Sequence, residues 1–221
     1  MSQTLMALAA ALPVSAGWTL HSLMLRRRIE VARRDPLSGL WTRAPFEERA
    51  RKTLGVRSRA VMVLDLDGFK QINDTYGHAV GDAVIAVTGR RLARWSTFHG
   101  GVAGRLGGDE FAASICCYNP QSLRQAMDDL AQELRAPVEF EDHVLWVGFS
   151  AGVVRAQRGS RAAELPRLMR CADEVMYSAK QTGGGWMVGA DNAAPAYRTV
   201  NGRRDGRRGA SAHHSTEGGA L

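Results

Sequence analysis

Hydrophobic and polar positions divide the chain into short blocks that predict alternating strands and helices. Residues 60–66 are apolar at nearly every position, which is typical of a strand covered on both faces. Two further apolar runs, residues 102–106 and 111–117, flank the string Gly107-Gly-Asp-Glu110. Adjacent glycines between two apolar runs predict a β-hairpin with a tight turn.

Apolar residues recur every three or four positions between these strands, which indicates amphipathic helices that are ended by glycine or proline signals. The expected helices are residues 43–55, 68–77, 79–96, 121–135 and 165–181. A second hairpin is expected from residues 138–140 and 144–154, with its turn at Glu141 and Asp142.

The predicted order is strand, two helices, hairpin, helix, hairpin and helix. This order favours an α+β domain, ferredoxin-like or palm-like, in which helices cover one face of a mostly antiparallel central sheet. We expect residues 35–187 of the 221-residue chain to form this one domain. Residues 188–221 are rich in Gly, Ala, Ser and Arg, and we expect a disordered basic tail there.

The N-terminal segment has a different pattern. Residues 5–25 contain no charged side chain, and three arginines follow at 26–28. A helix of this length reaches roughly the 30 Å of a bilayer core, and the arginines favour a cytoplasmic location for the following domain. We interpret residues 1–25 as a hydrophobic helix that anchors the protein to the inner or plasma membrane, and residues 26–34 as a basic connecting helix.

Two other interpretations of the N-terminal segment stay open. Pro13, Gly17 and His21 make residues 5–25 a mediocre membrane span. The segment could instead be a soluble helix that pairs with its copy in a cytoplasmic protein. It could also be a cleaved signal peptide, although the region before the apolar run has no basic residue.

Positive charge is concentrated outside the predicted domain. The chain has a formal net charge of +7, but residues 35–186 hold almost equal numbers of basic and acidic side chains. The excess consists of arginines within residues 26–34 and 198–208. A nucleic-acid-binding domain would carry its own basic face, so we expect no specific nucleic-acid partner. Basic flanks suit an anionic membrane surface better.

The cysteines indicate neither a metal site nor a disulfide framework. Cys116, Cys117 and Cys171 show no CxxC or Cys/His spacing, and their number is odd. We therefore expect three reduced thiols in the cytosol.

Carboxylates at the strand ends are the candidate chemistry. The string Gly107-Gly-Asp-Glu110 places two of them directly after glycines, whose missing Cβ lets a polyanion approach the backbone N–H groups. Asp65 and Asp67 interrupt the apolar strand near its C-terminal end. Because Mg²⁺ prefers carboxylate oxygens together with substrate phosphates, these residues indicate a shared divalent cation. A solvated turn and a helix cap are the alternative interpretation of the same residues.

Four separated segments carry short motifs in one order. Residues 35–43 begin with Asp-Pro-Leu-Ser-Gly-Leu, and residues 65–82 begin with Asp-Leu-Asp-Gly-Phe-Lys. Residues 105–111 read Arg-Leu-Gly-Gly-Asp-Glu-Phe, and residues 172–180 end in Tyr-Ser-Ala-Lys. In these four motifs, spread over about residues 35–183, the chain resembles the GGDEF domain family of diguanylate cyclases.

The resemblance implies an enzyme that joins two GTP into cyclic di-GMP with release of two pyrophosphates. It implies two Mg²⁺ (or Mn²⁺) ions per GTP site, held by Asp65, Asp109 and the backbone carbonyl of Leu66, with Glu110 in the same catalytic cluster. Because each domain would hold one GTP, a homodimer is part of the implied mechanism. The implied substrate-binding residues are Asn73 and Asp82 for guanine, Lys70 and Lys180 for the β- and γ-phosphates, and Phe69, Gly107 and Gly108.

The sequence departs from the family pattern in two places. Phe98 and Gly101 stand where many members carry an Arg-x-x-Asp product-inhibition motif, so we expect no high-affinity feedback site. Gly184 stands where an arginine commonly binds phosphate, which implies roughly one to two orders of magnitude lower GTP affinity or rate. A non-catalytic module that binds GTP or a protein partner and signals by contact is therefore the alternative interpretation.

Overall fold

The computed structural model describes residues 33–54, 59–156 and 159–190, together with Trp18, His21 and the short segments 199–200 and 203–204. The elements of the first half are β1 (Trp41–Thr42), α2 (Arg43–Leu54), β2 (Arg59–Leu66), α3 (Phe69–Tyr76), α4 (His78–Phe98), β3 (Val102–Gly107) and β4 (Glu110–Cys116). The elements of the second half are α5 (Pro120–Arg135), β5 (Val138–Phe140), β6 (His143–Leu145), β7 (Phe149–Arg155), the 3-10 turn η1 (Ala162–Glu164), α6 (Leu165–Gln181), β8 (Gly185–Val188), β9 (Thr199–Val200) and β10 (Arg203–Arg204).

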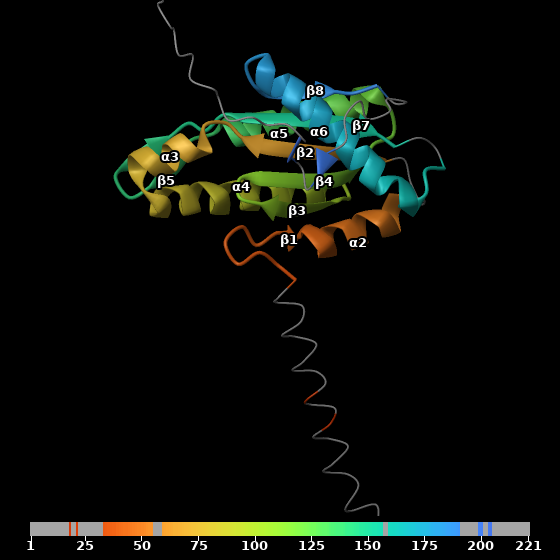
Figure 1. Ribbon diagram of the computed structural model, residues 1–221, viewed down its shortest axis with the longest axis horizontal. Coiled ribbons are helices and arrows are strands. Elements are labelled where there is room, and N and C mark those ends of the chain that lie inside the picture. The colour runs from red at the N-terminus through yellow and green to blue at the C-terminus, as the bar shows by residue number, and fades with distance from the viewer. Residues whose placement is uncertain are drawn as a thin grey trace, which may run out of the picture.

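The central sheet has six strands in the order β1-β3-β4-β2-β7-β8 (Figure 1). The four inner strands pair antiparallel, whereas the edge strands β1 and β8 pair parallel with β3 and β7. The sheet is therefore mixed, and the expectation of a mostly antiparallel sheet holds only for its centre. Both parallel strands were missed by the sequence analysis because two and four residues are too few to show a period.

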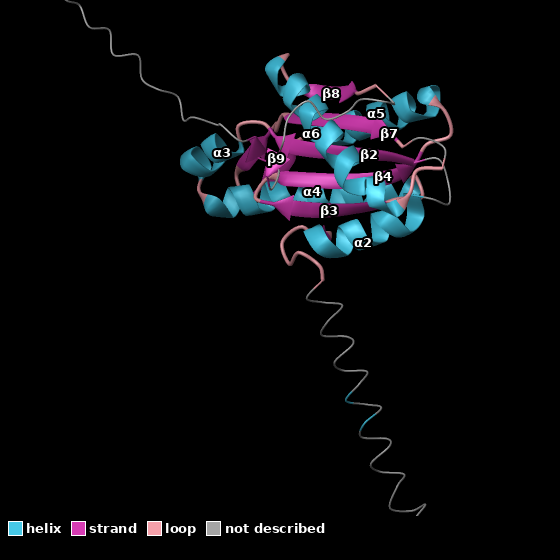
Figure 2. Cartoon of the chain, turned by 45° about the vertical axis from the view of Figure 1, so that its right-hand side comes forward, coloured by secondary structure: helices cyan, strands magenta, loops and turns pink. Residues whose placement is uncertain are grey.

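Helices cover both faces of the sheet, which corrects the expectation of a one-sided arrangement (Figure 2). Alternate residues of β2 point to opposite faces: Met62 and Leu64 lie in a core cluster with α4 and α5, whereas Val61 and Val63 lie in a second cluster with α2 and α6. The apolar character of nearly every position in β2 follows from this double burial.

The second predicted hairpin is divided into two parts in the structure. β5 and β6 form a small separate sheet, and β6 ends at Leu145. The chain then passes through Trp146 to Gly148 before β7 begins at Phe149 and joins the central sheet beside β2. The single strand expected over residues 144–154 was wrong because Gly148 accepts a hydrogen bond from the N–H of Asp67 instead of continuing the β5–β6 ladder.

No helix within the described part of the chain is long and apolar enough to cross a membrane. The predicted hydrophobic helix of residues 5–25 lies outside that part, apart from Trp18 and His21. At the other end, β8 continues to Val188, and the N–H of Gly189 donates to the carbonyl of Val153 at 2.8 Å.

Candidate active site

The predicted metal-binding residues meet where β2 ends beside the β3–β4 turn. Asp65 lies directly opposite Glu110 on β4 and opposite Ser150 on β7. One residue further, the N–H of Leu66 donates to the backbone carbonyl of Asp109 at 3.3 Å. The sheet register therefore brings four residues to the same end of the central strands: Asp65, Leu66, Asp109 and Glu110.

The two glycines of the turn have left-handed backbone conformations. The φ angles of Gly107 and Gly108 are 147° and 54°, and a β-bulge lies between Arg105 and Gly107. A Cβ added to either glycine would meet no atom within 4 Å, so conformation rather than crowding favours glycine here. The turn thus presents open backbone beside the carboxylates, as predicted.

The carboxylates repel one another in the absence of a cation. Burial, and then the negative charge of Asp65, raise the pKa of Asp109 above its ordinary value. Burial, followed by the charges of Asp173 and Asp65, also raises the pKa of Glu110. Both shifts have the sign expected of a half-buried acidic cluster that lacks its counter-charge.

Lys180 partly supplies that counter-charge. Lys180 lies in the last turn of α6, and its Nζ donates a hydrogen bond to Oδ1 of Asp65 at 2.5 Å. The helix packs against β2 and β7 through its buried side, which includes Leu168, Ala172 and Met176. This packing fixes the position of α6 and thereby places Lys180 beside the carboxylates.

A metal ion fits this edge only together with further oxygen ligands. Within the described residues, no group of three or more His, Cys, Asp or Glu side chains is arranged as a complete metal site. Asp65 and Asp109 offer two carboxylates, and Leu66 adds a backbone carbonyl. Mg²⁺ is commonly held by one or two carboxylates plus substrate phosphates. The donor set therefore fits a cation that binds together with a phosphorylated substrate.

The residues predicted to bind guanine lie on α3 and α4, which pack against each other. Asn73 is half-buried on α3, and Asp82 is exposed near the start of α4. A Cβ on Gly81 would lie 2.0 Å from Oδ1 of Asn73 and 3.3 Å from the ring of Phe69. Gly81 therefore makes room for the Asn73 side chain. The sequence analysis missed this role, although the glycine directly precedes Asp82.

Phe69 and Lys70 form the first turn of α3, directly after Gly68. Phe69 packs partly against the main core, whereas Lys70 is exposed. Gly68 has a φ of 67°, so the chain turns sharply between the end of β2 and this helix. The turn places Lys70 in the first turn of α3, shortly after the end of β2 at Leu66.

Asp67 has a different environment from Asp65. Its Oδ1 accepts a hydrogen bond from Oγ of Ser150 at 2.7 Å, and its backbone N–H donates to Gly148. A Cβ on Gly184 would lie 2.9 Å from Oδ2 of Asp67. The carboxylate thus ties the residue after β2 to β7 and lies beside the glycine loop after α6.

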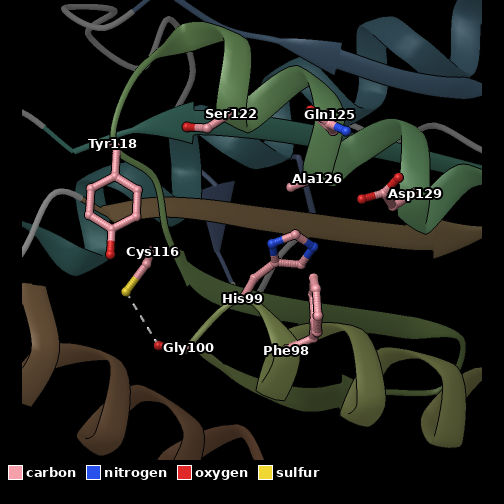
Figure 3. A pocket seen from close by; sticks show the side chains of 9 residues that line it. All are labelled: Phe98, His99, Gly100, Cys116, Tyr118, Ser122, Gln125, Ala126 and Asp129. Atoms are coloured by element: carbon pink, nitrogen blue, oxygen red, sulfur yellow. Dashed lines mark hydrogen bonds between the residues drawn. The ribbon is translucent and has the colours of Figure 1, made fainter.

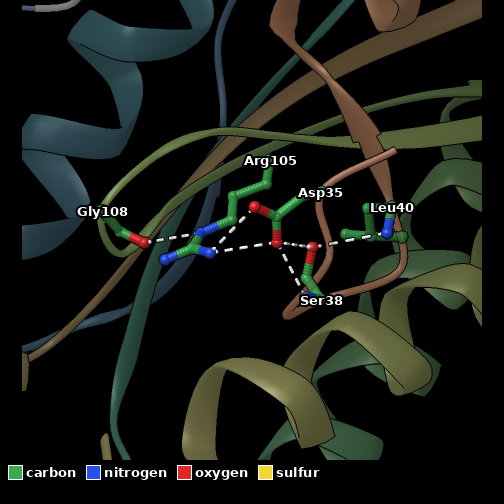
Figure 4. Close-up of polar contacts among 5 residues, drawn as sticks. All are labelled: Asp35, Ser38, Leu40, Arg105 and Gly108. Carbon is green, nitrogen blue, oxygen red and sulfur yellow. Dashed lines mark hydrogen bonds and ion pairs between the residues drawn. The ribbon is translucent and has the colours of Figure 1, made fainter. Parts of the chain in front are cut away.

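Arg105 joins the turn to the start of the domain (Figure 4). Its Nη1 donates to both carboxylate oxygens of Asp35, at 3.0 and 3.1 Å, and its Nε donates to the carbonyl of Gly108 at 2.9 Å. Asp35 also accepts hydrogen bonds from the backbone N–H and the hydroxyl of Ser38. These contacts connect residues 35–38 to the glycine turn, a link that sequence spacing could not reveal.

Phe98 and Gly101 lie at the opposite end of the strands from the carboxylates. Phe98 is the last residue of α4 and its side chain is 80% exposed. A Cβ on Gly101 would lie 2.3 Å from the carbonyl oxygen of Ser114 and 2.9 Å from Cα of Ile115. An aspartate therefore has no room at position 101 without a backbone shift.

The chain is similar in sequence to known proteins. A protein from Streptomyces ambofaciens, described as an uncharacterized 19.3 kDa protein in the repSA 5′ region, is 43% identical over 178 residues, which cover 78% of this chain and 91% of that protein. The diguanylate cyclase DgcN of Escherichia coli is 36% identical over 163 residues, which cover 69% of this chain and 38% of that protein. The chain thus spans less than half of the Escherichia coli enzyme.

Solved structures show the same fold. The coiled coil and GGDEF domain of DgcB from Caulobacter crescentus, in complex with c-di-GMP, matches with a TM-score of 0.70 and 23% identity, over 85% of this chain and 100% of that chain. A sensory box/GGDEF family protein from Caulobacter crescentus matches with a TM-score of 0.61 and 34% identity, over 68% of this chain and 99% of that chain.

The mixed sheet with its glycine turn and flanking carboxylates defines an α+β domain with an acidic site at one sheet edge. The family model described as "Diguanylate cyclase, GGDEF domain" matches residues 32–185. The chain belongs to the GGDEF domain family.

Proposed function

We propose that the protein is a diguanylate cyclase that joins two GTP into cyclic di-GMP and releases two pyrophosphates. The observation that carries this proposal is the meeting of Asp65, Asp109 and Glu110 at the glycine turn, with the pKa values of Asp109 and Glu110 both raised. Carboxylates that repel one another in the free protein are the arrangement that a cation-bound triphosphate relieves.

The residues of this chain take separate roles in the proposed reaction. Asp65, Asp109 and the carbonyl of Leu66 hold the divalent cations, two Mg²⁺ or Mn²⁺ per GTP, and Glu110 adds charge to the same catalytic cluster. The bound cations would lower the pKa of the attacking 3′-hydroxyl and stabilise the leaving oxygen. The open backbone of Gly107 and Gly108 lets the phosphates approach.

Substrate recognition is assigned to α3, α4 and α6. Asn73 and Asp82 bind the guanine edge, because an amide and a carboxylate complement its O6 acceptor and its N1–H and N2–H donors. Lys70 and Lys180 contact the β- and γ-phosphates, and Phe69 packs beside them. Lys180 would exchange its contact with Asp65 for one with phosphate when cations occupy the carboxylates.

The reaction needs two chains. One site holds one GTP, so two domains must face each other as a homodimer for a 3′-hydroxyl to reach the partner nucleotide. We propose that the hydrophobic helix of residues 1–25 promotes this dimer and anchors it to the membrane, and that residues 26–34 connect it to the domain. The domain itself spans residues 35–187, followed by the basic tail of residues 188–221. We propose no feedback site at Phe98 and Gly101, since neither supplies a cation for phosphate.

A second candidate function is a non-catalytic GGDEF module that binds GTP or a protein partner and signals by contact. The observation in its favour is Gly184, which has a φ of 87° and provides no side chain for phosphate where relatives commonly carry arginine. The intact carboxylate cluster supports the cyclase more strongly, because signalling by contact with a protein partner does not require it.

Product formation separates the two candidates. The full-length chain is incubated with GTP and Mg²⁺ or Mn²⁺ at high protein concentration, and nucleotides are resolved by chromatography. Cyclic di-GMP from the parent protein and its absence from an Asp109→Asn variant would support the cyclase. A dimer that binds GTP without forming product would support the non-catalytic module.

A further inference from the structure

A cavity of about 510 Å³ lies at the end of the sheet opposite the carboxylates (Figure 3). Its walls come from the last turn of α4, the end of β4 and the first turns of α5. The cavity and the acidic site lie at opposite ends of β4, because this strand begins at Glu110 and ends at Cys116. The volume is within the range of about 300–1,000 Å³ that is usual for small-molecule sites.

Aromatic side chains stand at the mouth of the cavity. The side chain of Phe98 is 80% exposed and that of Tyr118 is 73% exposed. The ring of His99 packs edge-on against Phe98, with 5.1 Å between centroids and planes at 89°. Figure 3 shows Tyr118 and the pair of Phe98 and His99 on different sides of the cavity. Exposed aromatic faces around a hollow favour a flat ring system that stacks on them.

The polar lining is neutral or acidic. Ser122, Gln125 and Asp129 contribute to the cavity from α5, and no lysine or arginine lines it. Burial lowers the pKa of His99, although the charges of Asp129 and Glu133 oppose the shift, which favours the neutral imidazole. A ligand with phosphate groups would therefore find a carboxylate but no cation among the lining residues.

His99 also has unused hydrogen-bonding capacity. Its Nε2 is buried and has no hydrogen-bond partner among the described residues. Buried polar atoms are paired in the great majority of cases, so this nitrogen is an unexplained polar atom beside the cavity.

We propose that the cavity binds a planar aromatic molecule that lacks phosphate and carries a positive charge or N–H donors facing Asp129. The site is separate from the one proposed for GTP, and its chemistry differs from that of the cyclic dinucleotide product. The ligand would stack on Phe98 and Tyr118 and direct its cationic or N–H edge to Asp129.

Proflavine, a flat three-ring cation, is a suitable probe. The full-length chain is titrated into proflavine at low micromolar dye concentration, and fluorescence anisotropy gives the dissociation constant. The double variant Phe98→Ala/Tyr118→Ala should weaken binding about tenfold or more, since stacking contacts are lost. Asp129→Asn should weaken it about fivefold to tenfold through the lost charge.

Matched controls keep the result interpretable. Phe98 and Tyr118 are so exposed that their truncation leaves the core intact, and Trp146→Ala removes an aromatic side chain of similar exposure, 72%, outside the cavity. Trp146→Ala should leave the dissociation constant unchanged. Asp109→Asn should also leave it unchanged, so the cavity is tested independently of the cyclase reaction.

Three results would overturn the proposal. They are the absence of saturable proflavine binding, an unchanged dissociation constant in the double variant, and equally tight binding of fluorescein, a flat anionic dye of similar size. Loss of cyclic di-GMP formation with retained proflavine binding would count only against the cyclase.

Discussion

Arg105 and Asp35, which are 70 positions apart in the sequence, form an ion pair beneath the glycine turn, with Nη1 3.0 and 3.1 Å from the two carboxylate oxygens. Both side chains are largely buried, at 16% and 18% exposure. The same guanidinium donates to the carbonyl of Gly108. The first turn of the domain and the turn beside the carboxylates are therefore held by one side chain.

The Asp35–Arg105 pair should contribute measurably to stability. Asp35→Asn is expected to lower the free energy of unfolding by about 1–3 kcal/mol at pH 7, because Arg105 loses its charged partner in a half-buried site. Burial raises the pKa of Asp35, but hydrogen bonds from Ser38 and Arg105 outweigh it, and the net pKa is lowered. The contribution is thus present above pH 3.8 and is lost as the pH falls through the lowered pKa.

Urea unfolding at several pH values measures this effect. The ion pair of Glu47 and Arg51, within helix α2, is a matched control that is more exposed. Glu47→Gln should cost about 0.5 kcal/mol or less. Equal losses from Asp35→Asn and Glu47→Gln at pH 7 would contradict the importance given to Arg105.

Removing one charge from the acidic cluster should stabilise the metal-free protein. The pKa of Asp109 is raised, so its charge disfavours the folded state once the pH rises through that pKa. Asp109→Asn should raise the free energy of unfolding on the order of 0.5–1 kcal/mol at pH 7, after allowance for solvent screening. That corresponds to a melting temperature about 1–4 °C higher.

The pH dependence and the response to ligand identify the cause. The gain from Asp109→Asn should disappear below pH 3.8, where the carboxyl is protonated in both states. With GTP and Mg²⁺ the order should reverse, because only the parent protein gains stability from binding. Asp74→Asn, at an exposed position on α3, is the control. It should change neither the free energy of unfolding of the free protein nor the stabilisation by GTP and Mg²⁺. A gain that is independent of pH would point to packing instead of charge.

Gly81→Ala tests the proposed guanine site. The added Cβ would lie 2.0 Å from Oδ1 of Asn73 and would displace that side chain. The affinity for GTP should fall about tenfold or more, while the weak affinity for ATP stays nearly the same, because only the guanine contacts change. Calorimetric titration of both nucleotides measures this difference.

Gly89→Ala serves as the matched control for Gly81→Ala. Its Cβ would meet the carbonyl oxygen of Ser38 at 2.3 Å, so the variant should lose stability without losing the preference for GTP over ATP. An equal loss of affinity for GTP and ATP in Gly81→Ala would indicate a general disturbance of α4. It would contradict the assignment of Asn73 to the guanine site.

Gly184→Arg asks whether the missing phosphate contact can be restored. The φ of Gly184 is 87°, and an added Cβ would lie 2.9 Å from Oδ2 of Asp67. A side chain here should therefore cost about 1–2 kcal/mol of stability. Gly184→Ala carries the same strain without the charge, so a lower KM for GTP in the arginine variant than in the alanine variant would isolate the phosphate contact. Equal KM values would show that position 184 does not reach the nucleotide.

Local patterns account for much of the fold. The helix predicted over residues 165–181 coincides with α6, and apolar residues such as Leu168 and Met176 are buried on one side of it. The helix predicted over 121–135 begins one residue earlier, at Pro120, where Asn119 caps it. In such helices the buried positions recur over enough residues for the helical period to be visible in the sequence.

Other features depend on contacts that no local pattern records. The strand β1 is defined by its parallel pairing with β3, and β8 by its parallel pairing with β7. In both cases the paired strand lies far away in the sequence. The contact of Arg105 with Asp35 and the space that Gly81 leaves for Asn73 likewise exist only after folding. The acidic cluster could be predicted because Asp65 interrupts the apolar run of β2 near its C-terminal end, and Asp109 and Glu110 follow the two glycines of the turn between β3 and β4.

The stoichiometry of product formation tests the central claim most directly. Full-length protein is incubated with GTP and Mg²⁺, and cyclic di-GMP and pyrophosphate are quantified in the same sample alongside an Asp109→Asn control. The proposed reaction predicts two pyrophosphates released for each cyclic di-GMP from the parent protein and no product from the control. GTP binding by a dimer without either product, or product formation that survives Asp109→Asn, would contradict it.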